Sequence, residues 1–279
     1  MKAAVLCEQP GDLVIEDLKI DTPGPQEVLI QTVGAGLCHS DLHFMEGLFR
    51  SKLPAVMGHE SAGIVQSVGR DVAYVKPGDH VVACLSIFCG QCRQCLSGNP
   101  HRCSNTRATS RGRDDEPRLQ RHDGTPVDQM ARLGGFAEEM LIHQNGIVKV
   151  TEDVSLEKAC LIGCGVTTGF GAAVKTAAVP VGATVCVIGC GGIGLSAIQG
   201  ARVAGASRII AVDMSAEKLE TAKVMGATDT LNASETDDVV TAVKELTKGG
   251  VEYSFEANGL KQTAEQAYEM LAVGGTATI

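Results

Sequence analysis

The sequence predicts an α/β protein of two domains, with a β-rich N-terminal half and a C-terminal half built on a parallel sheet. Up to about residue 150, short runs rich in Val and Ile are punctuated by Gly, Pro and Asp, as in antiparallel strands. From about residue 155, strands and helices alternate, which is typical of a parallel sheet with helices on both faces. The length of 279 residues also suits two domains. We therefore predict domains over residues 1–155 and 156–279.

The N-terminal half contains three clear strand signals, at residues 27–38, 62–69 and 79–85. Two of them follow the turn sequences PGPQEV and KPGDHV, in which proline fixes φ before the strand begins. Such short strands predict a small, partly closed antiparallel barrel. Residues 105–133 are polar, charged and without periodicity. We expect them to form a long surface excursion that borders a cleft, since loops of this length are commonly functional.

The C-terminal half begins with a helix over residues 155–162, for which Ser155 is the predicted N-cap. Strand and helix signals then alternate. Strands are expected at residues 184–189, 207–213, 227–231, 251–258 and 274–279, and helices at residues 191–205, 215–226, 236–247 and 261–271. A complete sheet of this type has six strands, so we expect one strand to be missing and the fifth to be cut short. We expect the chain to be part of a longer one, poorly active alone and prone to aggregate through an unpaired edge.

The composition excludes several classes of function. The formal net charge of −9, without any basic run, argues against a nucleic-acid-binding surface. No apolar stretch approaches the roughly 20 residues of a membrane helix, and the N-terminus shows no signal-peptide pattern. The eleven cysteines are odd in number, and a chain of this size does not need disulfides. We therefore expect a cytoplasmic protein whose thiols are reduced and mostly bound to metal. We expect neither a nucleic acid nor a membrane to be its partner.

Four cysteines lie close together in the segment CGQCRQCLSGNPHRC, at Cys89, Cys92, Cys95 and Cys103. Their spacing brings four thiolates within reach of one tetrahedral ion, as in a closed structural zinc site. Free thiols at this spacing in one loop have no good packing role. The sequence therefore predicts a structural zinc lobe at about residues 89–103, whose metal fixes a segment that lacks a core of its own.

A second set of metal-ligand types flanks this lobe in the chain. Cys38 and His59 precede it in GLCHSDLH and GHE, and Cys164 follows it in LIGCGVTTG. Two cysteines and one histidine are the three protein ligands of a catalytic zinc that keeps its fourth position open. Cys160 competes with Cys164 because only one helical turn separates them. The glycines beside Cys164 favour a backbone bend that exposes its thiol, so we prefer Cys164.

The segment VCVIGCGGIG predicts a dinucleotide-binding turn. It places Gly189, Gly191 and Gly194 after an apolar strand and at the start of a helix, with Gly192 and Ile193 between them. The first glycine permits a tight turn, the second lets the backbone approach a pyrophosphate, and the third allows the helix and strand to pack closely. The phosphates would then lie at a helix N-terminus, where unpaired N–H groups favour an anion.

A carboxylate at the end of the next strand indicates which dinucleotide binds. Asp213 lies at the distance expected for the residue that binds the adenosine ribose hydroxyls. Its charge would repel a 2′-phosphate, so NAD is predicted over NADP. Lys218 would supplement the ribose contact, although an exposed helix lysine explains this residue equally well.

With these motifs in this order, the chain resembles the zinc-dependent alcohol dehydrogenases of the medium-chain dehydrogenase/reductase family over essentially its whole length. The resemblance implies a GroES-like β-barrel catalytic domain followed by a Rossmann domain, a doubly wound parallel sheet that is truncated in its fifth strand. It implies hydride transfer between NAD and a small alcohol, aldehyde or ketone, with one catalytic and one structural zinc. The full-length protein is expected to be a homo-oligomer.

The resemblance also implies roles around the catalytic zinc. Glu60 matches a position behind the metal from which a carboxylate can approach it, and Asp41 matches the carboxylate that orients the histidine ligand. Ser40 and His43 resemble the family's proton relay, which runs from a hydroxyl through the cofactor ribose to an imidazole at the surface. For His43, an ordinary exposed histidine is an equally good interpretation.

Two further positions resemble cofactor contacts in the family. His39 matches a position where relatives often carry a cation near the pyrophosphate, although a solvated loop histidine would look the same. Thr168 resembles a position near the nicotinamide, and its alternative is a helix-capping or buried hydroxyl.

Two other functions stay open at this point. Related enzymes oxidise a formaldehyde–thiol adduct with similar metal sites, and the arginines of residues 105–133 could supply a cationic pocket for the carboxylates of the thiol. A zinc-stabilised protein that holds NAD without turnover is the alternative from another class. Such a protein would be expected to lack a catalytic-zinc ligand or the Ser40 hydroxyl, and neither is missing.

Overall fold

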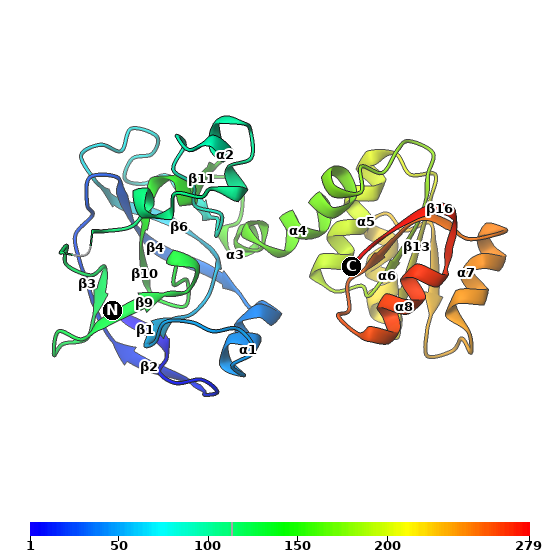
Figure 1. Ribbon diagram of the computed structural model, residues 1–279, viewed down its shortest axis with the longest axis horizontal. Coiled ribbons are helices and arrows are strands. Elements are labelled where there is room, and N and C mark those ends of the chain that lie inside the picture. Colours follow the sequence, from blue (N-terminus) through cyan, green and yellow to red (C-terminus); the bar gives the residue numbers. More distant parts are fainter. Residues whose placement is uncertain (113) are drawn as a thin grey trace. The chain divides into compact units, whose positions relative to one another are not determined.

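The computed structural model describes residues 1–112 and 114–279. The chain divides into two compact units, Met1–Cys164 and Gly165–Ile279 (Figure 1). The boundary that the sequence predicts, between residues 155 and 156, stays a prediction about the limits of the folding domains. Among the described helices no single one is long and apolar enough to cross a membrane, although the pair Leu156–Gly163 and Gly165–Thr176 together has the length and composition.

The first unit contains two sheets made of short strands. One has the order β2-β1-β5-β9-β8-β3, with β1 (Lys2–Leu6), β2 (Leu13–Asp17), β3 (Lys19–Ile20), β5 (Ala55–Val56), β8 (Leu119–Gln120) and β9 (Pro126–Gln129). The other has the order β10-β4-β6-β7-β11, with β4 (Glu27–Gly36), β6 (Glu60–Val68), β7 (His80–Ala83), β10 (Glu139–His143) and β11 (Ile147–Val150). The predicted barrel is antiparallel except for β5 and β9, which pair in parallel. A parallel pair needs a long connection, and the residues between these two strands supply one.

Short helices in this unit carry the segments between the strands. The α-helices are α1 (His39–Met45), α2 (Arg93–Leu96) and α3 (Leu156–Ala159). The 3-10 helices are η1 (Pro100–Arg102), η2 (Thr106–Thr109), η3 (Met130–Arg132), η4 (Gln144–Gly146) and η5 (Cys160–Gly163). Ser155 is the N-cap of α3 in position, as predicted, although its side chain makes no capping hydrogen bond. Helices α3 and η5 are therefore held by packing on the sheet, where Leu156, Ala159 and Cys160 are buried with Ala62 and Val82.

The prediction that residues 105–133 form a long surface excursion that borders a cleft is only partly right. Residues of the segment, Ser110 and Arg111 among them, line a cavity of about 480 Å³, but the segment does not lie wholly on the surface. The segment contributes both strands of the β8–β9 hairpin and several core side chains, which are Leu119, Val127, Met130 and Leu133. These apolar residues are too widely spaced for a periodic pattern. Ion pairs within the fold explain part of its charge, at Arg111, Arg118 and Arg121, whereas Arg107 and Asp114 are exposed.

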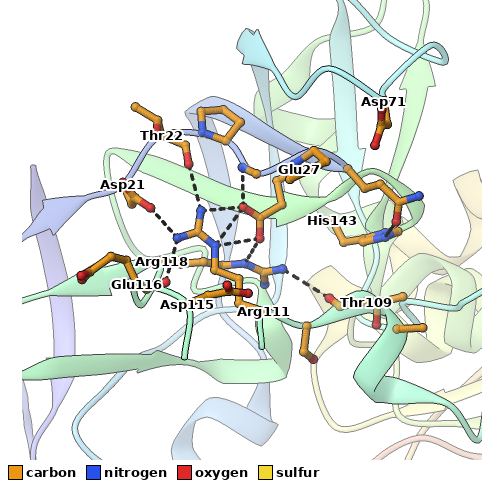
Figure 2. A pocket seen from close by; sticks show the side chains of 16 residues that line it. Asp21, Thr22, Glu27, Asp71, Thr109, Arg111, Asp115, Glu116, Arg118 and His143 are labelled. Carbon is orange, nitrogen blue, oxygen red and sulfur yellow. Dashed lines mark hydrogen bonds and ion pairs between the residues drawn. The ribbon is translucent and has the colours of Figure 1, made fainter. Parts of the chain in front are cut away.

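The strongest of these ion pairs join the segment to β4 and can be followed in Figure 2. The guanidinium groups of Arg111 and Arg118 converge on the carboxylate of Glu27, at 2.7 Å and 2.6 Å respectively. Burial opposes the ionisation of Glu27, but the two guanidinium groups and the Gly24 amide outweigh it and lower its pKa to about 2. We call Glu27, Arg111 and Arg118 the arginine clasp.

The second unit is a five-stranded parallel sheet with the order β14-β13-β12-β15-β16. Its strands are β12 (Thr184–Ile188), β13 (Arg208–Asp213), β14 (Asp229–Asn232), β15 (Val251–Glu256) and β16 (Leu271–Thr278). Its helices are α4 (Gly165–Gly171) with the π-helix Ala172–Thr176, α5 (Gly192–Ala204), α6 (Ala216–Met225), α7 (Val239–Thr247) and α8 (Lys261–Glu269). Strand β12 buries Val185 and Val187 against α5 and α6, and Cys186 and Ile188 against α7 and α8. Both faces are covered, so the predicted doubly wound fold is confirmed.

The fifth strand differs slightly from its prediction. Strand β16 begins at Leu271 rather than at Gly274 and lies at the edge of the sheet beside β15. The helical pattern predicted for residues 261–271 ends earlier, because Val251 pairs with Leu271 in the sheet. Gly274 adopts a φ of 82°, and the strand register shifts in this region.

Replacing Glu27 by Gln is expected to destabilise the protein at neutral pH, because two arginines lose their common carboxylate. A pKa of about 2 against an ordinary value near 4.5 corresponds to about 3 kcal/mol of unfolding free energy. Since the folded-state pKa is depressed, this stability is present above about pH 4.5 and is lost as the pH falls toward 2. Urea unfolding of wild type and variant, from neutral pH downward, measures the difference.

The matched control is Glu220→Gln, which removes an exposed ion pair with Lys223. It should change the unfolding free energy by less than about 1 kcal/mol. A difference between wild type and Glu27→Gln that stays constant with pH would contradict the assigned role of the clasp.

Candidate metal and dinucleotide sites

The four cysteines of the predicted lobe converge on one point. The Sγ–Sγ distances are 3.9 Å from Cys89 to Cys95, 3.5 Å from Cys92 to Cys95 and 3.9 Å from Cys92 to Cys103. A tetrahedral zinc with Zn–S bonds of about 2.3 Å separates its sulfurs by about 3.8 Å. The donor set and its spacing therefore fit a zinc ion saturated by protein ligands.

The backbone of the lobe prepares its thiols for a metal. Amide groups of Cys95 and Ser104 donate to the Cys92 sulfur and lower the pKa of Cys92 to about 5. The Cys89 amide donates to the Cys103 sulfur and lowers the pKa of that thiol as well. Burial and the neighbouring sulfurs instead raise the pKa of Cys95 to about 11. A cation would remove this conflict, because it favours all four thiolates at once.

The second cluster brings together Cys38, His59, Glu60 and Cys164, whose ligand atoms all lie within 4.8 Å of one another. Cys38 is the N-cap of α1, and Glu60 is the first residue of β6. Cys164 follows η5 with φ −140° and ψ −80°, so the chain bends there as its flanking glycines predict. Sulfur and imidazole donors in this number suit a zinc site with a position left for a further ligand.

Asp41 connects two members of this second cluster. Its Oδ2 accepts a hydrogen bond from the Cys38 amide at 3.0 Å, and its Oδ1 lies 3.4 Å from His59 Nδ1. Burial disfavours a charged imidazole, but Asp41 and Cys164 outweigh burial and raise the pKa of His59 to about 11. The buried cluster therefore attracts positive charge, and a metal ion would compete with a proton for His59.

Cys160 lies outside this cluster. Its side chain is buried, and its Sγ donates to the Glu157 carbonyl oxygen at 3.2 Å. Burial raises the pKa of the Cys160 thiol, which disfavours the thiolate that a metal needs. Of the two candidates weighed from the sequence, only Cys164 is brought to Cys38 and His59.

The predicted relay residues lie on α1, directly after Cys38. Ser40 and His43 are half-buried and three positions apart, so they share a helix face. The His43 ring centroid lies 4.7 Å from that of the exposed His39 and 5.2 Å from that of Phe49. His39 and His43 thus form one small aromatic cluster beside the metal-ligand helix terminus.

The glycine turn of the second unit has the predicted geometry. Gly189 adopts a φ of 91°, which favours glycine, and a Cβ at Gly194 would lie 1.7 Å from the Gly189 carbonyl oxygen. Nothing lies within 4 Å of a Cβ built at Gly191 or Gly192, so the backbone is open to a ligand there. Helix α5 begins at this turn, at Gly192, and Ile193 follows on an exposed face.

Asp213 lies at the end of β13, beside the turn. Its carboxylate accepts hydrogen bonds from the amides of Cys190 at 2.7 Å and Ser215 at 2.9 Å. With Lys218 it lines a cavity of about 630 Å³ in the second unit. The cavity is also lined by residues that sequence reasoning missed, among them Asp237, Asn258, Leu260 and Gln262. Asn258 could have been found, because it follows the carboxyl end of β15 next to the switch point of the sheet.

Thr168 lies apart from this cavity. It is exposed on α4, and it is not among the described residues that line the cavity around Asp213. Its predicted contact with the nicotinamide stays a prediction, as does the phosphate contact of His39.

Comparison with known proteins gives a consistent result. The family description "Alcohol dehydrogenase GroES-like domain" matches residues 24–152, and "Zinc-binding dehydrogenase" matches residues 192–279. The chain is 40% identical to S-(hydroxymethyl)glutathione dehydrogenase of Saccharomyces cerevisiae, over 96% of this chain and 71% of the relative. Among solved structures, benzyl alcohol dehydrogenase from Acinetobacter calcoaceticus is 38% identical with a TM-score of 0.86, covering 99% of this chain and 75% of that chain. A zinc-binding domain protein from Burkholderia ambifaria, titled an alcohol dehydrogenase, is 37% identical with a TM-score of 0.90 at the same coverage.

Replacing Cys38 or His59 by Ala is expected to remove the zinc of the second cluster and leave the zinc of the four-cysteine lobe. The matched control is Cys160→Ala, which removes a thiol one helical turn from Cys164 and should keep both metals. Zinc content per chain after dialysis measures the outcome, and NADH binding should persist in all three variants. Loss of zinc in Cys160→Ala, or full zinc content in Cys38→Ala, would contradict the ligand assignment.

Proposed function

The chain belongs to the medium-chain zinc alcohol dehydrogenases, oxidoreductases that transfer hydride between an alcohol and a nicotinamide cofactor, and we propose that it oxidises small uncharged alcohols with NAD. The observation that carries this proposal is the contrast between its two sulfur-rich clusters. The lobe offers four thiols and leaves no place for a substrate. The cluster of Cys38, His59 and Cys164 offers three nitrogen and sulfur donors, with Glu60 as an approaching carboxylate.

When bound there, zinc would supply a Lewis acid that makes a substrate hydroxyl more acidic. Asp41 would hold the His59 ring through Nδ1, so that the other ring nitrogen faces the cysteine sulfurs. Ser40 Oγ would accept the proton of the alcohol, because a hydroxyl can both accept and donate. The half-buried imidazole of His43 would release that proton to solvent.

The proposal of NAD over NADP is supported by the charge around the cavity at β13. Asp213 and Asp237 both line it, and a 2′-phosphate placed among these carboxylates would be repelled. Lys218 is exposed at its rim and would add a contact to the ribose. Asp213 also accepts a hydrogen bond from the Cys190 amide and so holds the glycine turn. The same carboxylate would therefore stabilise the turn and bind the ribose hydroxyls.

The choice of an uncharged alcohol over a glutathione adduct rests on the arginines of residues 105–133. A glutathione adduct carries carboxylates that call for free cationic groups. Of the five arginines that the structure describes in this segment, Arg107 is exposed. The other four bind groups of the fold: Arg111 binds Glu27 and Asp21, Arg118 binds Glu27, Arg121 binds Glu16, and Arg132 binds Thr109. Guanidinium groups that are bound in this way do not form a receiving surface for a charged substrate.

Two further expectations belong to this proposal. We propose that the enzyme works in the cytoplasm, since its two clusters need reduced thiols. We also propose that the full-length protein is a homo-oligomer. A protein that binds NAD without turnover is disfavoured, since its expected loss of a ligand or of the Ser40 hydroxyl is not observed.

A substrate panel tests the proposed activity. With NAD⁺, the kcat/KM for benzyl and simple aliphatic alcohols is expected to exceed that for the glutathione adduct of formaldehyde. A chelator that removes only the zinc of the second cluster should abolish turnover without releasing NADH. Turnover confined to the glutathione adduct would contradict the proposed substrate class.

Replacing Asp213 by Asn is expected to weaken NAD⁺ binding and improve NADP⁺ binding, because the Asn side chain loses the charge while its oxygen still accepts from one of the two backbone amides that Asp213 binds. The lost charged hydrogen bond to the ribose should cost about 1.5–3 kcal/mol, or about ten- to a hundredfold in affinity. Glu217→Gln, an exposed acid on α6 that does not line the cavity, is the control. An unchanged ratio of the two cofactor affinities would rule out the ribose contact.

A further inference from the structure

Three of the four donors of the catalytic cluster lie beside a glycine at which a side chain would collide with the fold. Gly163 precedes Cys164, Gly58 precedes His59, and Gly36 lies opposite Glu60 in the pairing of β4 with β6. None of these glycines carries a metal-binding group. Their surroundings nevertheless decide where the donor beside each one can lie.

Gly163 is held against the backbone of a central strand. A Cβ built there would lie 2.3 Å from the carbonyl oxygen of Ala83, the last residue of β7. Strand β7 is paired on one side with β6 and on the other with β11, so its backbone cannot easily shift. Helix η5 would have to move away from the sheet instead, and Cys164, the next residue, would move with it.

Gly58 is constrained by its conformation and by its neighbours. It adopts a φ of 90°, and a Cβ there would lie 2.4 Å from Phe136 Cδ1 and 2.7 Å from the Phe136 backbone nitrogen. The backbone around it is already bonded, because Gly135 donates to the Gly58 carbonyl at 2.9 Å. A side chain at this position would therefore displace the chain just before His59.

Gly36 differs because only side-chain atoms surround its Cβ position. A Cβ there would lie 2.3 Å from Glu60 Oε2 and 2.6 Å from Leu161 Cδ2. These atoms end flexible side chains, so they can yield without a shift of the backbone. The displaced group would be the Glu60 carboxylate rather than a sulfur or imidazole donor.

We propose that Gly163 and Gly58 are positioning residues for the catalytic metal, because the absence of a Cβ lets the backbone place Cys164 and His59 in the cluster, whereas Gly36 is not one, because only flexible side-chain ends surround it. The proposal rests on the assignment of Cys38, His59 and Cys164 as the metal site. It predicts a graded effect. A side chain at Gly163 or Gly58 would press on backbone atoms and should strongly lower the affinity of the catalytic cluster for zinc. A side chain at Gly36 would press only on side-chain ends and should leave that affinity nearly unchanged.

The test is chelator competition for zinc on the full chain, with each of the three glycines replaced by Ala. Gly163→Ala and Gly58→Ala are expected to bind the zinc of the catalytic cluster about ten- to a hundredfold more weakly, as for other groups that orient metal ligands. Gly36→Ala should keep an affinity close to that of wild type. The cobalt-substituted cluster should show weaker sulfur-to-cobalt absorption in Gly163→Ala and an unchanged band in Gly36→Ala.

Two matched controls separate the effect of a steric contact at the new Cβ from the effect of the glycine backbone conformation. Gly124→Ala has the same φ of 90° as Gly58 but nothing within 4 Å of its Cβ. Gly171→Ala has a helical φ of −66° and equally open space, which makes it the control for Gly163. Both controls should keep wild-type zinc affinity in both clusters. The zinc of the four-cysteine lobe reports whether each variant is folded.

The outcomes distinguish the proposal from the assignment beneath it. If wild type binds zinc only in the four-cysteine lobe, the metal-site assignment fails. If wild type binds both metals and Gly163→Ala and Gly58→Ala bind them equally well, the positioning roles are overturned. If Gly163→Ala also loses the zinc of the four-cysteine lobe, that variant has not folded. The zinc affinity of the catalytic cluster is then compared between Gly58→Ala and Gly124→Ala, and equal affinities would overturn the proposal.

Discussion

The first unit depends on one electrostatic constraint, which is the crowding of negative groups around His59. Cys38, Glu60 and Cys164 place two thiols and a carboxylate with His59 in one cluster, and Asp41 stands behind the imidazole. Thiolates and a carboxylate this close together would repel one another, and a cation would stabilise their ionised forms. The pairing of β4 with β6, the N-cap of α1 and the bend at Cys164 all bring donors to this point.

The glycine turn of the second unit offers backbone groups, and Asp213 beside it offers a carboxylate, to the predicted dinucleotide. The turn from β12 to α5 exposes amide groups around Gly191 and Gly192, with no side chain to block them. Asp213 holds this turn from the next strand, through the Cys190 amide. The position of the turn is therefore set by the register of two parallel strands, which in turn is set by the apolar residues on both faces of β12.

Charge has a structural use in residues 105–133 as well. The arginine clasp binds this segment to β4 through Glu27, and the hairpin of β8 and β9 buries its few apolar side chains. An arginine bound to a buried carboxylate is unavailable to a substrate, which links the packing of the first unit to the proposed preference for uncharged alcohols. The same arginines look like surface charge in the sequence, because a pattern of residue types does not reveal their partners.

The sequence by itself determined the local features of this protein. The spacing of Cys89, Cys92, Cys95 and Cys103 and the glycine turn before α5 act over a few residues, and the alternation of strand and helix determined the doubly wound sheet. Only the tertiary structure decided what depends on distant segments. It paired Arg111 and Arg118 with Glu27, paired β5 with β9, and placed Gly163 against Ala83. The physical reason is that contacts between residues far apart in the chain depend on packing and strand register, which no local pattern specifies.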